Sequence, residues 1–258
     1  MIGIVRVQDN QNGLLKNYLL DCPGDIKMKN LVIKAAKYSA KAYDENTIST
    51  GTTQVLVIQE NDATWIVFRG TEGKLNDIIA DAKIRKEVTD IGEIHRGFND
   101  AYMLVNEDAI AFAKKAKDAG KKLYIAGHSL GGALAVIAAL YFNLDGLSPD
   151  KVITFGCPRV VGKETAEKVN LNHKRLFCRV VNNNDVVTRI PPRSLGYSHI
   201  GDLWYYKESG ELVMDNDLSW WDLFWDRIEG RLEDFGEFGT DGLKDHFMDS
   251  YKKQIGII

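Results

Sequence analysis

The chain has 258 residues, of which 45% are apolar and 27% are charged, and its formal net charge is −3. These values are ordinary for a globular protein that is large enough to bury a substantial core. No basic block stands out, which argues against nucleic acid as a partner. No apolar run has the length of a transmembrane helix, and Met1 to Asp9 lack the pattern of a signal peptide.

The cysteine content bears on the cellular compartment. The three cysteines are Cys22, Cys157 and Cys178, an odd number with no pairing pattern. Reduced thiols are typical of intracellular proteins. We therefore expect a cytoplasmic protein, with a secreted protein whose leader has been removed as the alternative.

Helical and strand patterns alternate along the chain without a repeat, a linker or a change of composition, which predicts one domain over residues 1–258. In chain order we expect a helix over 27–42, a hairpin with strands at 52–59 and 63–68, a helix over 98–119, a strand at 123–126, a helix over 130–142, strands at 152–155 and 176–181, and a second hairpin with strands at 203–206 and 211–214. This order predicts an α/β protein with a mostly parallel central sheet and helices on both faces.

A candidate nucleophile lies between the strand at 123–126 and the helix that follows it. The sequence Gly127-His128-Ser129-Leu130-Gly131 fits the G-x-S-x-G nucleophile elbow. Glycine is needed on both sides of the serine because strand and helix pass closely there. A chance glycine-rich turn is the alternative, but the position between an apolar strand and an apolar helix favours Ser129 as the nucleophile. We expect His128 to point away from Ser129 and to pack or form hydrogen bonds.

A serine nucleophile needs a base, and the base needs an orienting acid. In α/β-hydrolases these follow the serine in the order acid, then histidine. Asp185 lies in a loop after the strand at 176–181, which suits the acid; the alternative is an ordinary aspartate in an asparagine-rich turn.

Two histidines follow Asp185 along the chain. His246 comes after the last hairpin and before a terminal helix, where a loop can reach the sheet edge, whereas His199 leads into the hairpin. His95 and His173 precede the acid and have the wrong order. We predict His246 as the base, against the alternative of a surface histidine at a helix start.

Several further motifs accompany this triad, and together they are specific. They are Phe68-Arg69-Gly70-Thr71, His95-Arg96-Gly97-Phe98, Thr154-Phe155-Gly156-Cys157-Pro158-Arg159-Val160, Asn184 to Pro192, Tyr197-Ser198-His199, and Asp245-His246 with Tyr251. With them, the chain resembles the class 3 lipases, which include fungal triacylglycerol lipases and feruloyl esterases, over roughly residues 27 to 255. The resemblance implies an α/β-hydrolase fold and the triad Ser129, Asp185 and His246. It also implies an oxyanion hole formed by the backbone N–H groups of Thr71 and Leu130.

Two segments have no settled role. Residues 75–84 form a short amphipathic pattern where the family resemblance implies a lid, and they lack the tryptophan of some lipase lids. Residues 218–235 carry aromatic residues at helical spacing. A helix packed on the core is one reading of that segment, and a wall of an acyl pocket or a membrane-contacting face is the other.

The function that follows is a serine carboxylic-ester hydrolase, which cleaves acylglycerols or similar lipid esters through an acyl-enzyme on Ser129. The alternatives are an esterase for feruloyl or carbohydrate esters and a non-catalytic binding protein with the hydrolase fold. We expect no cofactor, and no metal, because no histidine pair has ligand spacing. The expected partners are a lipid or small ester substrate and, transiently, a lipid interface. No nucleic acid and no obligate protein partner are expected.

Overall fold

The computed structural model describes residues 4–8, 15–19, 23–70, 85–214 and 244–258. Thr71, the lid segment at 75–84 and the aromatic segment at 218–235 lie outside these residues. Contacts divide the chain into two compact units, residues 1–34 and 35–258. The single domain over 1–258 remains a prediction.

The first unit contains a hairpin and the beginning of a helix. Strands β1 (Ile4–Gln8) and β2 (Leu15–Leu19) pair antiparallel, with Ile4 opposite Leu19. We predicted no element for these residues. Helix α1 (Pro23–Lys41) begins earlier than the predicted start at residue 27. Proline explains the early start, because its fixed φ suits the first helical position and its missing N–H has no helical partner there.

The second unit is built around an eight-stranded sheet with the order β14-β13-β11-β9-β8-β5-β4-β3. The strands are β3 (Ile48–Thr50), β4 (Thr53–Gln59), β5 (Ala63–Phe68), β8 (Lys122–His128), β9 (Lys151–Phe155), β11 (Phe177–Asn182), β13 (Asp202–Tyr206) and β14 (Leu212–Met214). Strands β5, β8, β9, β11 and β13 are parallel, and the outer strands pair antiparallel. The predicted α/β class, both hairpins and the mostly parallel sheet are therefore confirmed.

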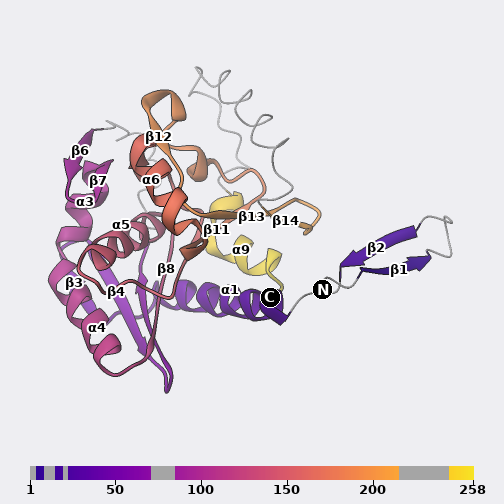
Figure 1. Cartoon of the computed structure of the whole chain (residues 1–258), viewed down its shortest axis with the longest axis horizontal. Coiled ribbons are helices and arrows are strands. Elements are labelled where there is room, and N and C mark those ends of the chain that lie inside the picture. Colours follow the sequence, from indigo (N-terminus) through magenta and orange to yellow (C-terminus); the bar gives the residue numbers. More distant parts are fainter. Residues whose placement is uncertain (1–3, 9–14, 20–22, 71–84, 215–243) are drawn as a thin grey trace. The chain divides into compact units, whose positions relative to one another are not determined.

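Helices cover both faces of this sheet. Helices α3 (Arg96–Met103), α4 (Asn106–Asp118) and α5 (Leu130–Leu144) group together (Figure 1), and they share a hydrophobic core with Ile66 and Phe68 of β5. Neighbouring side chains of a strand point to opposite faces. Trp65 accordingly faces the other way, where the ring of Tyr38 in α1 packs edge-on at 5.3 Å. Helix α9 (Met248–Gln254) contacts β11.

The predicted helix over 98–119 is wrong, because the chain breaks there into α3 and α4. The hydroxyl of Thr53 in β4 donates a hydrogen bond of 2.8 Å to the carbonyl of Ala101. In a continuous helix that carbonyl would accept from Val105, whose N–H instead bonds the carbonyl of Tyr102. The carbonyl of Ala101 therefore has its donor in a distant strand at the point where α3 ends, and the sequence pattern of the helix alone gives no sign of this contact.

A second, four-stranded sheet has the order β12-β10-β7-β6. Its strands are β6 (Lys86–Thr89), β7 (Gly92–His95), β10 (Val161–Gly162) and β12 (Tyr197–Ser198). Further helical elements of the described residues include α6 (Lys163–His173) and the 3-10 turns η1 (Lys174–Leu176), η2 (Val186–Arg189) and η3 (Arg193–Leu195). Strands this short carry too little alternation for the sequence to reveal them.

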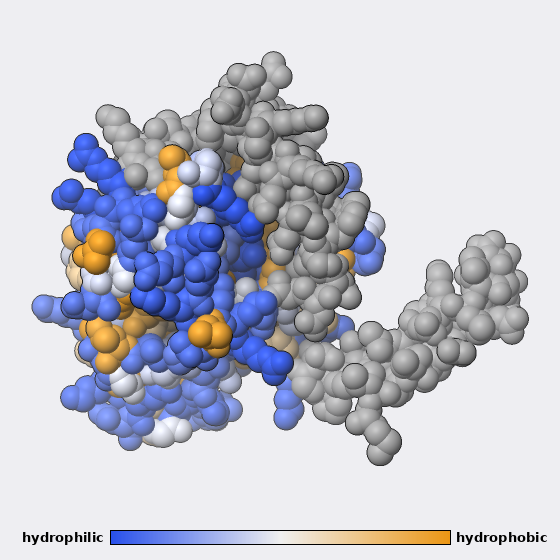
Figure 2. All heavy atoms as spheres, turned by 45° about the horizontal axis from the view of Figure 1, so that its top comes forward, coloured by the Kyte–Doolittle hydropathy of each residue, from blue (hydrophilic) through white to orange (hydrophobic). Residues whose placement is uncertain are grey.

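Among the described residues, no helix is both long and apolar enough to cross a membrane. Figure 2 shows one face of the molecule, where the coloured residues are mostly hydrophilic and the hydrophobic ones form separate small patches. The apolar side chains of the described residues on this face therefore do not join into one broad surface.

Candidate active site

Ser129 lies on a sharp turn between β8 and α5. Its φ of 57° and ψ of −127° place it in a region that non-glycine residues seldom adopt. Such strained backbone persists where the surrounding structure enforces it, and it is frequent at active sites. The Ser129 N–H is fixed by the carbonyl of Phe155 in the neighbouring strand β9 at 2.9 Å.

The glycines around the serine are required by close backbone contacts. A Cβ atom on Gly127 would collide with the carbonyl of Gly131, and one on Gly131 would collide with the carbonyl of Phe68. Strand β8, helix α5 and the end of β5 thus pass too closely for any side chain. The expected reason for the G-x-S-x-G spacing is confirmed.

The structure brings Ser129, His246 and Asp185 into one chain of hydrogen bonds. The Nε2 atom of His246 lies 2.8 Å from the Oγ atom of Ser129, and its Nδ1 atom lies 3.0 Å from both carboxylate oxygens of Asp185. Because a carboxylate only accepts, Nδ1 carries the proton and Nε2 accepts from the serine hydroxyl. The three side chains are almost fully buried, at 2%, 3% and 0% exposed respectively.

The competing histidine, His199, has a different environment. Its Nε2 atom donates to the carbonyl of Thr188 at 2.8 Å. Burial, and then the charges of Arg179 and Arg159, hold the pKa of His199 well below its usual range. His199 is therefore a neutral, partly buried residue that is hydrogen-bonded to the backbone, and the structure places His246 beside Ser129.

The other early histidine, His95, caps a helix. Its Nδ1 atom accepts from the N–H of Phe98 at 3.3 Å, and its ring stacks on that of Phe98 at 4.1 Å. Burial lowers the pKa of His95 to about 4. The H-x-G-F motif thus starts α3.

Tyr251 in α9 is a further partner of the acid. Its hydroxyl donates to Oδ2 of Asp185 at 2.6 Å and accepts from the N–H of Asn182 at 3.1 Å. Burial and the negative charge of Asp185 raise the pKa of Tyr251 well above its usual range, so the hydroxyl stays a donor. The sequence placed Tyr251 only in the terminal helix, and its contact with Asp185 depends on how α9 packs.

The loop that carries Asp185 is held on several sides. The Oδ1 atom of Asp185 accepts from the N–H of Val187 at 2.9 Å. The buried guanidinium of Arg159 donates to the carbonyls of Arg189 and Pro191, the latter at 3.0 Å. The arginine that follows Pro158 in the sequence therefore supports the acid loop from the end of the neighbouring strand.

The asparagine run before Asp185 binds the residue that precedes the base. The amide of Asn182 donates to the Asp245 carbonyl at 2.9 Å, and the amide of Asn183 donates to its carboxylate at 3.1 Å. The N–H of Asn184 donates to the same carboxylate at 3.2 Å. Asn183 has a φ of 38°, which asparagine tolerates better than most residues. The run thus connects the acid loop to the base loop.

Gly156 lies directly against the acid and the base. It follows β9 with a φ of 56°, and a Cβ atom here would lie 2.7 Å from Oδ2 of Asp185 and 2.9 Å from Nδ1 of His246. The T-F-G-x-P-R-V motif identified Gly156 without giving it a role. Its role is to leave room for the side chains of Asp185 and His246.

Of the two oxyanion-hole residues implied by the resemblance, one is described. Leu130 is the first residue of α5, where backbone N–H groups have no partner within the helix and point toward the positive end of its dipole. Thr71 lies outside the described residues. The part played by each donor remains a prediction.

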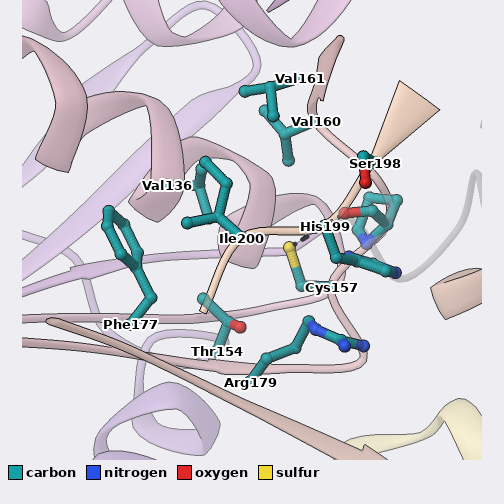
Figure 3. A pocket seen from close by; sticks show the side chains of 11 residues that line it. Val136, Thr154, Cys157, Val160, Val161, Phe177, Arg179, Ser198, His199 and Ile200 are labelled. Carbon is teal, nitrogen blue, oxygen red and sulfur yellow. Dashed lines mark hydrogen bonds between the residues drawn. The ribbon is translucent and has the colours of Figure 1, made fainter. Parts of the chain in front are cut away.

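A small cavity lies near Cys157 and is distinct from the triad (Figure 3). Its volume is about 10 Å³, and its lining includes Thr154, Cys157, Arg179 and His199. That volume is enough for one water molecule and too small for an ester. Burial raises the pKa of Cys157 to about 12, so this thiol stays protonated. Among the described residues, no cluster of acidic, histidine or cysteine side chains has the makings of a metal site.

A serine on a strained strand-to-helix turn, in a mostly parallel sheet, defines an α/β-hydrolase. The model of the class 3 lipase family matches residues 65–195, which are about half of the chain. The chain belongs to the class 3 lipase family. This confirms the resemblance and the α/β-hydrolase fold expected from the sequence.

Relatives and solved structures agree with this assignment. The chain is 36% identical over 128 residues to secreted mono- and diacylglycerol lipase 1 of Fusarium solani, covering 49% of this chain and 38% of that protein. It is 30% identical over 193 residues to secreted mono- and diacylglycerol lipase MDL2 of Malassezia globosa, covering 72% and 59%. The structure of the Rhizomucor miehei triacylglyceride lipase matches with a TM-score of 0.63 at 24% identity, covering 73% and 83%. The chain spans less than two fifths of the Fusarium protein's length.

Proposed function

We propose that this protein is a serine carboxylic-ester hydrolase, in which Ser129 is the nucleophile, His246 the general base and Asp185 the orienting acid. One observation carries the proposal: the unbroken hydrogen-bond chain from the Ser129 hydroxyl through His246 to the Asp185 carboxylate. It has the order and the donor directions that serine hydrolases need.

In the proposed reaction, Oγ of Ser129 attacks the ester carbonyl while Nε2 of His246 takes its proton. The negative charge on the carbonyl oxygen is stabilised by the N–H groups of Leu130 and Thr71. The tetrahedral intermediate then collapses, the alcohol leaves with the proton from His246, and the acyl group stays on Ser129. A water molecule, deprotonated by His246, releases the acid and restores the serine.

We propose acylglycerols or similar lipid esters as the substrate class. The fungal relatives are named mono- and diacylglycerol lipases, and the Rhizomucor enzyme is named a triacylglyceride lipase. The test is a series of p-nitrophenyl esters of increasing acyl length, run beside mono-, di- and triacylglycerols and a methyl ferulate control. Hydrolysis of acylglycerols above that of methyl ferulate supports the proposal. Preference for the ferulate would move the protein to the feruloyl esterase branch.

The non-catalytic alternative is separated by the same assay. A binding protein would hydrolyse none of these esters, and its residual rate would not change in Ser129→Ala. A rate that falls about 10⁴-fold in that variant, as when serine-hydrolase triads are broken, supports catalysis.

The location and the lipid contact are also proposals. The cytoplasmic location expected from the cysteines has no support from relatives that are named secreted, so we favour the secreted alternative. Fractionation of the native host, with a specific antibody, decides between the two. We propose only a transient contact with lipid interfaces. Pelleting of the protein with phosphatidylcholine vesicles that withstands repeated washing would contradict it.

A further inference from the structure

His128, the residue before the nucleophile, bonds to two distant parts of the chain. Its Nδ1 atom lies 2.6 Å from the hydroxyl of Tyr43, in the turn after α1, and its Nε2 atom lies 2.6 Å from the carbonyl oxygen of His246. Its ring packs at 4.8 Å from the ring of His246. His128 is 4% exposed and its bond to His246 is buried, while Tyr43 is partly buried.

The chemistry of the partners fixes the direction of both hydrogen bonds. Burial, and then the nearby charge of His246, lower the pKa of His128 to about 3, so its imidazole is neutral and has one N–H. A carbonyl oxygen only accepts, so the N–H must be on Nε2 and must donate to His246. Nδ1 is then an acceptor, and the Tyr43 hydroxyl donates to it. Tyr43 thereby selects the tautomer of His128 that binds the base's backbone.

The position of the Tyr43 hydroxyl is itself restricted. A Cβ atom on Gly70 would collide with this hydroxyl and would lie 2.7 Å from the carbonyl of His128. The end of β5, Tyr43 and the elbow are therefore packed without spare room. Gly70 immediately precedes Thr71, one of the two proposed oxyanion donors.

The hydrogen bond from His128 to the His246 carbonyl links the nucleophile and the base by a second route. Ser129 and His128 are adjacent in the chain, and His128 bonds the backbone of His246, while Ser129 bonds its side chain. Because the first bond anchors the backbone, the imidazole of His246 keeps its distance to the Ser129 oxygen.

We propose that His128 and Tyr43 are positioning residues for acyl transfer: His128 donates a hydrogen bond to the backbone carbonyl of the base, and Tyr43 selects the His128 tautomer that can donate it. The proposal rests on the proposed function of Ser129 and His246. It assigns a chemical role to the variable position of the elbow, which the G-x-S-x-G pattern leaves open.

Two amide substitutions separate the role of each ring nitrogen. In His128→Gln, the side-chain amide nitrogen reaches the position of Nε2 and keeps the donor to His246. In His128→Asn, the shorter amide reaches only the position of Nδ1 and leaves that carbonyl without its donor. With a dissolved p-nitrophenyl ester, we expect kcat of the glutamine variant within about threefold of the wild type. We expect about a tenfold or greater loss in the asparagine variant, with KM unchanged in both.

A tyrosine substitution tests the other half of the connection. Tyr43→Phe removes the donor that selects the tautomer, so kcat should fall about fivefold to tenfold at constant KM. The matched control is Tyr102→Phe, because Tyr102 is fully buried and its hydroxyl has no hydrogen-bond partner among the described residues. His95→Asn is the control for a partly buried histidine that bonds the backbone, at the start of α3. Both controls should keep the wild-type kcat.

Labelling of Ser129 by a fluorophosphonate gives a second readout, and thermal melting reports folding. Equal kcat in the glutamine and asparagine variants of His128, or unchanged kcat in Tyr43→Phe, would overturn the proposal. The proposal would also be overturned if the loss of kcat paralleled the loss of melting temperature to the same extent in the test variants and in the controls. A wild-type protein that neither reacts with the probe nor hydrolyses esters would instead refute the proposed function.

Discussion

Tyr251 and Gly156 show how single residues complete the triad. The tyrosine hydroxyl donates to Asp185 at 2.6 Å, beside the bond from His246, so the carboxylate is held by two side chains. Gly156 removes the side chain that would otherwise occupy the same space. The catalytic geometry therefore depends on one group that is present and on one that is absent.

Tyr251→Phe should lower kcat about tenfold and leave KM unchanged. The substitution removes a hydrogen bond to a buried carboxylate but keeps the aromatic ring, so the acid loses part of its orientation while the fold is kept. Steady-state kinetics on a dissolved ester measure the effect. An unchanged kcat would mean that His246 and Val187 suffice to orient Asp185.

Gly156→Ala should lower kcat at least about a hundredfold, because the new methyl group pushes Asp185 and His246 apart. Strain from the positive φ also costs stability, on the order of 1 kcal/mol. Gly146→Ala is the matched control: its φ is 74°, and nothing lies within 4 Å of its Cβ position. Both variants should lose similar stability from strain, and only Gly156→Ala should lose activity. Equal activities in the two variants would contradict this role.

Ser129, Asp185 and His246 could be predicted because the chemistry fixes their types, their order and their places at strand ends. The partners Tyr43, Tyr251 and Arg159 could not be assigned a role, because each acts through a contact across the fold. Tyr43 and His128, for example, are 85 positions apart. The elbow motif nevertheless predicted correctly that His128 would form hydrogen bonds.

The elements position the site through their ends. The parallel strands β8, β9 and β11 have their carboxyl ends at the same end of the sheet. Ser129, Gly156 and the Asp185 loop follow these strand ends. Helix α9 then supplies Tyr251 and is preceded by His246. The long, periodic helices and buried strands could be predicted, whereas the break between α3 and α4 could not, since the contact found there comes from Thr53 of another strand.

Arg159→Met should lower the free energy of unfolding by about 2–4 kcal/mol. The variant leaves the carbonyls of Arg189 and Pro191 without a buried donor and loosens the loop that carries Asp185. Urea unfolding measures the loss, and activity should fall as well. Arg175→Met, at an exposed arginine of η1, should stay within about 0.5 kcal/mol of the wild type. A similar value for both variants would contradict the supporting role of Arg159.

For the whole molecule, one buried and two partly buried histidines make stability depend on pH. The pKa of His128 is lowered to about 3, that of His95 to about 4 and that of His199 well below its usual range. From about pH 6.5 down to about pH 4, the unfolded chain therefore binds protons at these sites while the folded chain does not. As the pH is lowered through this window, the free energy of unfolding should decrease, by at most about 1.4 kcal/mol per pH unit for each histidine.

Urea unfolding at pH 7.5, 6.5, 5.5 and 5.0 measures this slope. His199→Gln should make it shallower, because a neutral amide does not titrate. A free energy of unfolding that stays constant or increases as the pH is lowered from 6.5 to 5.0 would contradict the neutral state of the three histidines in the folded protein.

Of the architecture of the whole chain, only the central eight-stranded sheet and the helices around it could be predicted in outline. The α/β class follows from the alternation of long elements, but the sheet of β6, β7, β10 and β12 and the hairpin of β1 and β2 are built from strands too short to leave a periodic pattern. Their pairing is decided by long-range contacts.

The most direct test of the central claim is covalent labelling of the purified protein with a fluorophosphonate. We predict one adduct per chain, located on Ser129 by peptide mass spectrometry. It should be absent in Ser129→Ala, strongly slowed in His246→Ala and far less affected in His199→Ala, and loss of ester hydrolysis should follow the same order. Labelling at another residue, or full hydrolytic activity in a folded Ser129→Ala variant, would contradict the account.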